Sequence, residues 1–129
     1  MDILLIEDEE SLRKAFAEVL RSKGYKVFDI PDVSGNKLEN VLEGQHIDAI
    51  ISGIMQPYKD GLTVLKELKA DDRYKNIPYI IASNLSAENV IQEASRLGAQ
   101  LYIVNTQETI DSWGIRVDEF MKKLYDRSL

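Results

Sequence analysis

The amino-acid sequence predicts an α/β domain built on one doubly wound sheet of five parallel strands with five helices. Two observations support this fold class. Short apolar runs alternate along the chain with stretches whose apolar residues recur at helical spacing. The short runs contain no polar alternation, which is typical of strands that are buried on both faces of a parallel sheet. Because crossovers between parallel strands are right-handed, we expect the strand order 2-1-3-4-5.

The first strand, the first helix and the second strand have clear boundaries in the sequence. The apolar run at residues 3–6 predicts the first strand. From Ser11, apolar residues recur at helical spacing, and Gly24 supplies the stop for this first helix. Residues 25–30 predict the second strand, which Pro31 ends. Together they form one strand–helix–strand unit.

The middle of the chain repeats this alternation. A weaker helix is expected over about residues 34–43, followed by a third strand over residues 47–52. Residues 53–61 contain two glycines and Pro57, so we expect a loop there. Residues 62–68 carry leucines three positions apart and predict the third helix.

The last third of the chain supplies two more strands and two more helices. Residues 79–82 predict the fourth strand. Ser86 is expected to open a helix that Gly98 ends. A fifth strand over residues 101–104 and a final helix over about residues 108–125 complete the pattern.

The composition restricts the classes of function. A chain of 129 residues with 44% hydrophobic and 29% charged residues fits one globular domain, which we assign to residues 1–129. With 22 acidic against 16 basic residues, the formal net charge of −6 disfavours nucleic acid and membrane surfaces as partners. The absence of cysteine excludes disulfides and thiolate chemistry. The first apolar run is too short for a signal peptide or a membrane span, so we expect a cytoplasmic location.

Polar residues follow four of the predicted strands, at the edge where ligands bind in open α/β sheets. These positions are residues 7–10, 52–53, 83–84 and 105–106. Adjacent carboxylates repel each other unless they are solvated, protonated or bound to a cation, and Mg²⁺ is a natural partner of such oxygens. Alternatively, Glu9 and Glu10 only stabilise the N-terminus of the first helix.

Four motifs in this order resemble the receiver domains of two-component response regulators, and the resemblance covers the whole chain. The motifs are I-L-L-I-E-D-E at residues 3–9, D-A-I-I-S-G-I-M-Q-P-Y-K-D-G at 48–61, P-Y-I-I-A-S at 78–83 and L-G-A-Q-L-Y-I-V-N at 97–105. The resemblance implies a flavodoxin-like, CheY-like fold. It also implies an acidic pair at Glu7 and Asp8, a switch residue at Ser83, and at Tyr102 an aromatic residue whose rotamer is coupled to switching.

Two positions depart from the pattern of this family. In register, the phosphate-accepting aspartate falls on Gly53, and the active-site lysine falls on Asn105. Glycine offers no nucleophile and no side-chain metal ligand, which leaves Glu7, Asp8 and the backbone carbonyl of Met55 for a weakly held Mg²⁺. We therefore expect no catalytic residue, no enzymatic activity and no firmly bound cofactor.

Other residues of reactive type do not restore this chemistry. Ser52 should point to the opposite face of the sheet from Gly53, and Asp60 belongs to the loop that follows. The only histidine, His46, is expected in a solvated loop at the other edge of the sheet. Trp113 and the apolar stripe around it predict core packing. No glycine-rich phosphate-binding pattern follows the first strand.

The preferred interpretation is a pseudo-receiver, a non-enzymatic module that signals through protein contacts without phosphorylation. The resemblance implies that the fourth helix, the fifth strand and the fifth helix form a face for signalling partners or for a second copy of the chain. Exposed residues expected on this face are Glu93, Arg96, Gln100, Tyr102, Arg116 and Asp118. The alternative is a regulatory module whose remaining acidic pocket binds a cation or a small molecule. A hydrolase that uses Glu7 and Asp8 is a third interpretation, for which no activated nucleophile is visible.

Overall fold

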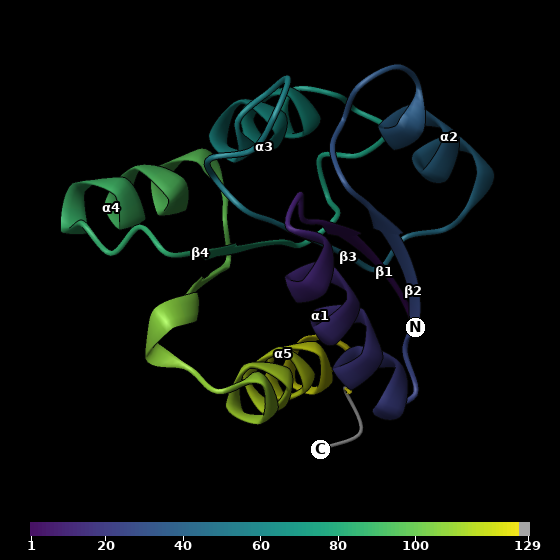
Figure 1. Ribbon diagram of the computed structural model, residues 1–129. Helices are drawn as coiled ribbons and strands as arrows, with labels where there is room; N and C mark the ends of the chain where they lie inside the picture. The colour runs from purple at the N-terminus through teal and green to yellow at the C-terminus, as the bar shows by residue number, and fades with distance from the viewer. Residues whose placement is uncertain (127–129) are drawn as a thin grey trace.

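The computed structural model describes residues 1–126, which form one parallel sheet with helices on both faces (Figure 1). The strands, in the sheet order β2-β1-β3-β4-β5, are β1 (Asp2–Ile6), β2 (Lys26–Ile30), β3 (Ala49–Ser52), β4 (Tyr79–Ser83) and β5 (Leu101–Val104). The helices are α1 (Glu10–Ser22), α2 (Lys37–Gly44), α3 (Gly61–Lys69), α4 (Glu88–Leu97), a short 3-10 helix η1 (Asn105–Gln107) and α5 (Ile110–Tyr125). The fold class and the strand order predicted from the sequence are both confirmed.

The register of the sheet brings the ends of its strands to one edge. Ile6, the last residue of β1, pairs with Ile30 of β2 on one side and with Ser52 of β3 on the other. Glu7 and Gly53, which follow Ile6 and Ser52, are therefore placed side by side beyond the carboxyl edge of the sheet.

Two apolar cores lie on opposite faces of the sheet. α1 and α5 lie side by side on one face, whereas α2, α3 and α4 cover the other (Figure 1). Successive residues of β1 point into different cores: Ile3 and Leu5 into the α1–α5 core, Leu4 and Ile6 into the other. Because both faces of β1 are buried from Ile3 to Ile6, the strand is apolar without interruption over these residues.

The packing of α1 against α5 depends on two positions in α5. The ring of Trp113 stacks on that of Phe16 with 3.9 Å between centroids, and Trp113 is 1% exposed, so the predicted core role is confirmed. A Cβ atom on Gly114 would lie 2.7 Å from Cγ2 of Val19 in α1. A glycine inside a helix costs about 1 kcal/mol relative to alanine. The close approach of α1 and α5 requires a residue without a side chain at position 114, which explains the glycine despite its lower helix propensity.

Two helices begin later than the sequence predicts. α2 begins at Lys37 because Ser34 forms a turn in which both its N–H and its hydroxyl bond to Oδ1 of Asp32. α4 begins at Glu88 because the backbone of Ala87 is still extended.

The start of α5 and of two strands also differs from the prediction. Thr109 and Ser112 form a reciprocal capping box that fixes the start of α5 at Ile110, and η1 occupies the preceding residues. β2 begins one residue after Tyr25, whose N–H closes the end of α1 by donating to the carbonyl of Leu20. β3 begins at Ala49 rather than at residue 47. None of the helices within residues 1–126 has the length and apolarity needed to cross a membrane.

Candidate functional site at the carboxyl edge of the sheet

A cleft of about 320 Å³ lies where β1, β3, β4 and β5 end. Its walls include Glu7 and Asp8 after β1, Gly53 after β3, Ser83 at the end of β4, and Asn105 after β5. The structure thus brings together the five positions that the sequence places at strand ends. The remaining lining residues are Glu9, Leu12, Ile54, Met55, Gln56, Ala82, Asn84 and Leu85.

The acidic wall of the cleft comes from the turn between β1 and α1. Glu7 is half-buried, and burial beside Asp8 raises the pKa of its carboxyl group, although the backbone N–H of Glu9 opposes this by donating to Oε2 at 2.9 Å. Glu10 instead forms an ion pair of 2.9 Å with Lys14 on the exposed first turn of α1. The interpretation as a helix-terminal charge therefore suits Glu10, whereas Glu9 lines the cleft.

The position of Gly53 leaves room for a side chain. A Cβ atom there would lie 3.7 Å from the carbonyl oxygen of Ala82 and 3.8 Å from Oε1 of Gln56, both ordinary van der Waals distances. The hydroxyl of Ser52 lies 2.6 Å from that of Tyr79. Both side chains are buried in the core on the face that α2, α3 and α4 cover. Ser52 therefore points away from the cleft, as the strand geometry predicts.

The loop that carries Gly53 is closed by a second glycine. A Cβ atom on Gly61 would lie 1.7 Å from the carbonyl oxygen of Gly53, so only glycine fits at position 61. The N–H of Gly61 donates to the carbonyl of Ile54 at 2.8 Å, and the hydroxyl of Tyr79 donates to the carbonyl of Gly61 at 3.3 Å. These contacts hold the backbone of residues 53 and 54, which form one wall of the cleft, against residue 61.

Three polar atoms on two side chains of the cleft are buried without a hydrogen-bond partner within the described residues. Neither Nε2 nor Oε1 of Gln56 has a hydrogen-bond partner within the described residues, and the same holds for Oδ1 of Asn105. A buried polar atom without a partner costs about 1–3 kcal/mol. Sequence reasoning missed Gln56, because no spacing rule marks one polar residue inside an irregular loop.

Ser83 and Tyr102 together hold the start of the loop between β4 and α4. Oγ of Ser83 accepts a hydrogen bond from the N–H of Leu85 at 3.1 Å. The hydroxyl of Tyr102 donates to the carbonyl of the same Leu85 at 2.6 Å. Burial raises the pKa of Tyr102, which keeps its phenol in the protonated, donating form. Tyr102 is half-buried, so the expectation that it is exposed is wrong.

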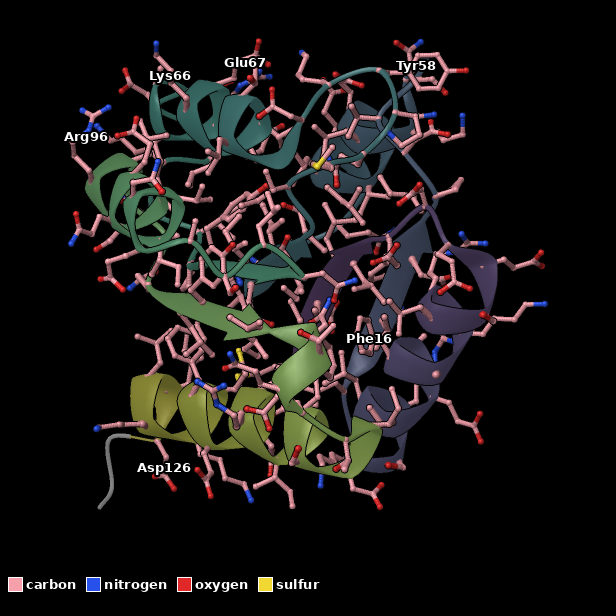
Figure 2. The ribbon with its side chains drawn as sticks, turned by 60° about the vertical axis from the view of Figure 1, so that its left-hand side comes forward. Phe16, Tyr58, Lys66, Glu67, Arg96 and Asp126 are labelled. Atoms are coloured by element: carbon pink, nitrogen blue, oxygen red, sulfur yellow. The ribbon has the colours of Figure 1, made fainter. Side chains whose placement is uncertain are left out.

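The loop between β3 and α3 carries two large side chains in solvent. Met55 is 77% exposed and Tyr58 is 78% exposed. Tyr58 has a φ of +70°, and the N–H of Lys59 donates to the carbonyl of Pro57 at 2.8 Å, which together define a γ-turn of the rarer, strained hand. Figure 2 shows the Tyr58 ring at the periphery, directed away from the body of the domain.

Asp60 ends the same loop and is not among the residues that line the cleft. Its carboxylate caps α3 by accepting from the N–H of Thr63 at 3.0 Å and from the hydroxyl of Thr63 at 2.8 Å. Burial acts to raise the pKa of Asp60, but these hydrogen bonds outweigh it, and the pKa is lowered. Asp60 is thus an ionised helix cap, and it does not take the place of a side chain at Gly53.

The residues expected to be exposed on the α4–β5–α5 face divide into two groups. Arg96 and Gln100 are exposed, and Arg96 points into solvent from α4 (Figure 2). Glu93 and Arg116 are half-buried, so the expectation that they are exposed is wrong. Glu93 forms two hydrogen bonds with the Arg96 guanidinium. Arg116 donates to Glu108 at 2.6 Å and so bridges α5 to the end of η1.

Asp118 does not belong to that face, so this expectation is wrong. Its Oδ1 accepts a hydrogen bond from the hydroxyl of Tyr25 at 2.7 Å, and its Oδ2 lies 3.1 Å from Nζ of Lys122. Residues four apart share one side of a helix, and Asp118 therefore follows Gly114 on the side that packs against α1. The helical periodicity of the sequence predicts that Asp118 lies outside the apolar core. It does not predict which neighbouring helix Asp118 contacts.

His46 lies at the opposite, amino edge of the sheet. Its side chain is 87% exposed, and Nε2 lies 3.1 Å from Oδ1 of Asp48. It lines a separate cavity with Tyr74 and Tyr125 and is absent from the cleft walls. A serine–histidine–aspartate arrangement with Ser83 is therefore excluded within the described residues.

Comparison with known proteins identifies the family. Residues 3–111 match the model of the response regulator receiver domain. The chain is similar to the chemotaxis protein CheY of Treponema pallidum, with 32% identity over 105 residues that cover 79% of this chain and 70% of that protein. It is also similar to the two-component response regulator-like protein APRR5 of Arabidopsis thaliana, with 32% identity over 104 residues and 79% of this chain. The chain spans only 18% of the length of APRR5.

Solved structures show the same fold. The chemotaxis protein CheY4 of Vibrio cholerae has a TM-score of 0.80 at 21% identity, over 92% of this chain and 96% of that chain. The receiver domain of the sensor histidine kinase PA1611 of Pseudomonas aeruginosa, which has a magnesium ion in its active-site cleft, has a TM-score of 0.76 at 21% identity, over 95% of this chain and 94% of that chain. With the family match over residues 3–111, the chain belongs to the response regulator receiver domains of two-component signalling.

Proposed function

We propose that this receiver domain is a phosphorylation-independent signalling module that acts by binding other proteins. The observation that carries the proposal is Gly53, which stands after β3 in the cleft and offers no side chain. An acyl phosphate requires a carboxylate nucleophile at the point of transfer. Without that residue the cleft lacks the group that receives the phosphoryl.

The other residues of the cleft support a non-enzymatic role. Asn105 supplies a neutral amide, and no lysine or arginine among the described residues lines the cleft to stabilise an incoming phosphoryl group. Ser83 carries the only hydroxyl among the lining residues, and its oxygen accepts the N–H of Leu85 with no histidine beside it. Glu7 and Asp8 therefore have no activated nucleophile to assist, which also argues against a hydrolase.

The donor set fits a resident Mg²⁺ poorly. Two adjacent carboxylates, Glu7 and Asp8, remain beside the neutral oxygens of Gln56 and Asn105. Among residues 1–126, no three histidine, cysteine, aspartate or glutamate side chains are grouped so that they could hold a metal ion. We propose that the domain has no firmly bound cofactor and that any Mg²⁺ binding at Glu7 and Asp8 is weak.

We propose that partners are other signalling proteins, or a second copy of the chain, in the cytoplasm. Arg96 and Gln100 give the α4–β5–α5 face its exposed polar groups, with Glu93 orienting Arg96. Because no covalent switch is available, a partner changes the conformation of the domain only through its different affinity for two states. The loop held by Ser83 and Tyr102 is the element on which such a difference acts.

A second candidate function is a ligand-responsive module, favoured by the Gln56 amide and the Asn105 amide oxygen, which have no hydrogen-bond partner within the described residues. In this role the cleft binds a cation or small molecule, and occupancy changes the contacts that the domain makes.

The proposal is tested by incubating the purified chain with a small-molecule phosphodonor and Mg²⁺ and measuring the intact mass. We expect no base-labile addition of a phosphoryl group. The double variant Gly53→Asp/Asn105→Lys serves as the positive control, because it restores both groups. A base-labile phosphoryl group on the unmodified chain would overturn the proposal.

A further inference from the structure

The cleft at the carboxyl edge of the sheet is lined by acidic side chains. Its lining residues include Glu7, Asp8 and Glu9 and, within the described part of the chain, no lysine or arginine. Arg13 is nearby in α1, but its guanidinium donates to the carbonyl oxygen of Glu7 and to the carboxylate of Asp29. The cleft therefore attracts a positive charge from outside the chain.

The unpartnered amide oxygens add a requirement for hydrogen-bond donors. Oε1 of Gln56 and Oδ1 of Asn105 are buried, belong to residues of the same cleft, and accept no hydrogen bond within residues 1–126. Most buried polar atoms in proteins have a partner, from protein, water or ligand. A ligand that donates several hydrogen bonds would satisfy both oxygens.

The rest of the lining is apolar. Leu12, Met55 and Leu85 contribute aliphatic side chains to the same cleft as the carboxylates. Met55 is 77% exposed, which leaves its thioether chain free to cover an apolar stem that enters from solvent. The cleft thus combines acidic and aliphatic side chains in one lining.

We infer that this cleft binds a primary alkylammonium group, carried either by a lysine side chain of a partner protein or by a small free amine. This inference deepens the proposed function by naming the chemistry that the cleft recognises. The three N–H groups of an ammonium need three acceptors, and the carboxylates and the two amide oxygens of the cleft supply acceptors of the right kind. The alkyl stem suits the aliphatic side chains of the same lining.

Other ligand classes match the lining less well. A phosphate or carboxylate meets three acidic side chains and no compensating cation. A neutral alcohol offers one donor and no charge, so it leaves the carboxylates without a counter-ion. A hard divalent ion prefers more charged oxygens than the grouping of acidic side chains in residues 1–126 provides.

The inference is tested by titrating the isotope-labelled chain with n-butylammonium chloride and following the backbone amide signals by NMR. We expect saturable shifts confined to the cleft-lining residues. n-Butanol, of the same length but neutral, and MgCl₂ are titrated separately. Equal binding of butanol, or shifts with Mg²⁺ but none with butylammonium, would overturn the inference.

Two variants with matched controls test the residues. Asp8→Asn should weaken butylammonium binding about tenfold, whereas Glu119→Gln, which removes one exposed charge from α5, should not change it. Asn105→Lys should abolish butylammonium binding, because the lysine places its own ammonium group in the cleft. Thr106→Lys adds the same charge at the next, exposed residue outside the cleft lining and should keep binding within about threefold. Equal effects of a variant and its control would contradict the inference.

A final comparison separates the two sources of the ammonium group. A short peptide with one central lysine, its termini blocked, is titrated beside butylammonium. At least tenfold tighter binding of the peptide supports a partner's lysine, and equal binding supports a free amine. Binding of neither contradicts the inference and leaves the proposed function standing, because that function is judged by the phosphodonor experiment.

Discussion

Oε1 of Gln56 lies 3.8 Å from the point that a Cβ atom on Gly53 would occupy, so the two residues share one wall of the cleft. The neighbour of the missing carboxylate is thus a neutral amide with no hydrogen-bond partner in residues 1–126. A side chain introduced at position 53 lies beside this amide and the carbonyl oxygen of Ala82, and the N–H₂ of the amide can donate to a new carboxylate.

This geometry predicts the result of Gly53→Asp. The variant should fold, because its Cβ atom is in ordinary contact with Ala82 and Gln56. It should take up phosphate from a small-molecule donor only slowly, because Asn105 supplies no positive charge. Intact-mass measurement over time gives the rate.

Two further variants show whether the carboxylate at position 53 or the neutral residue at position 105 determines the rate of phosphorylation. Gly53→Asp/Asn105→Lys should be faster by at least tenfold. Gly44→Asp, which adds a carboxylate at the exposed end of α2, should incorporate nothing. Rapid labelling of Gly53→Asp alone would show that the neutral residue at position 105 is no obstacle.

The contact between Gly114 and Val19 predicts a loss of stability on Gly114→Ala. The added methyl group would lie 2.7 Å from Cγ2 of Val19, and overpacking of this kind costs about 1–3 kcal/mol. The gain of about 1 kcal/mol from helix propensity offsets part of that cost. Urea denaturation should therefore show a lower free energy of unfolding.

Gly44→Ala is the matched control for this substitution. Nothing lies within 4 Å of a Cβ atom at Gly44, and its φ is not in the left-handed region. Its free energy of unfolding should be equal to or above that of the unmodified chain. A loss of similar size in both variants would mean that the α1–α5 contact is not the cause.

The contact between Tyr25 and Asp118 predicts a pH-dependent contribution to stability. Burial acts to raise the pKa of Asp118, but the hydrogen bonds from Tyr25 and Lys122 outweigh it, and the pKa is lowered. A lowered pKa means that the ionised form stabilises the fold at neutral pH. This contribution is lost as the pH falls below the ordinary aspartate value of 3.8.

Asp118→Asn should therefore lower the free energy of unfolding at pH 7 by about 1 kcal/mol, with a difference that shrinks toward pH 3. Glu119→Gln, at the next and exposed position of α5, should have little effect at either pH. Denaturation of the three proteins at pH 7 and pH 3 measures both differences. A difference for Asp118→Asn that persists undiminished at pH 3 would contradict an ionic origin.

The hydrogen bond from Tyr102 to the carbonyl of Leu85 predicts the behaviour of the loop between β4 and α4. Tyr102→Phe removes the donor and leaves the ring, so amide hydrogen exchange in residues 84–87 should become faster. Tyr58→Phe removes a hydroxyl from a side chain that is 78% exposed and should leave the same amides unchanged. Slower or equal exchange in Tyr102→Phe would show that another contact holds the loop.

The fold was predictable because burial on both faces leaves a strong trace in the sequence. β1 is apolar at every position from Ile3 to Ile6, since its side chains enter two different cores. The site was predictable for a related reason: parallel strands end at one edge, so the residues after them meet there. Local turn geometry shortens α2 and α4 at their starts. Such turns are only weakly indicated by the amino-acid sequence.

The features that could not be predicted depend on contacts between distant segments. Gln56 lies in an irregular loop whose path is set by the close approach of Gly61 to Gly53. The place of Asp118 depends on how α5 is turned against α1, and no helical periodicity gives that rotation. Gly114 looks unfavourable within its own helix and is explained only by Val19.

The two glycines of the loop between β3 and α3 differ in what mutation can do to them. At position 61 the backbone of Gly53 excludes every side chain, whereas at position 53 there is room for a Cβ atom. The same loop therefore holds one glycine that its backbone requires and one that it does not, and a carboxylate can be placed at position 53 without rebuilding the loop.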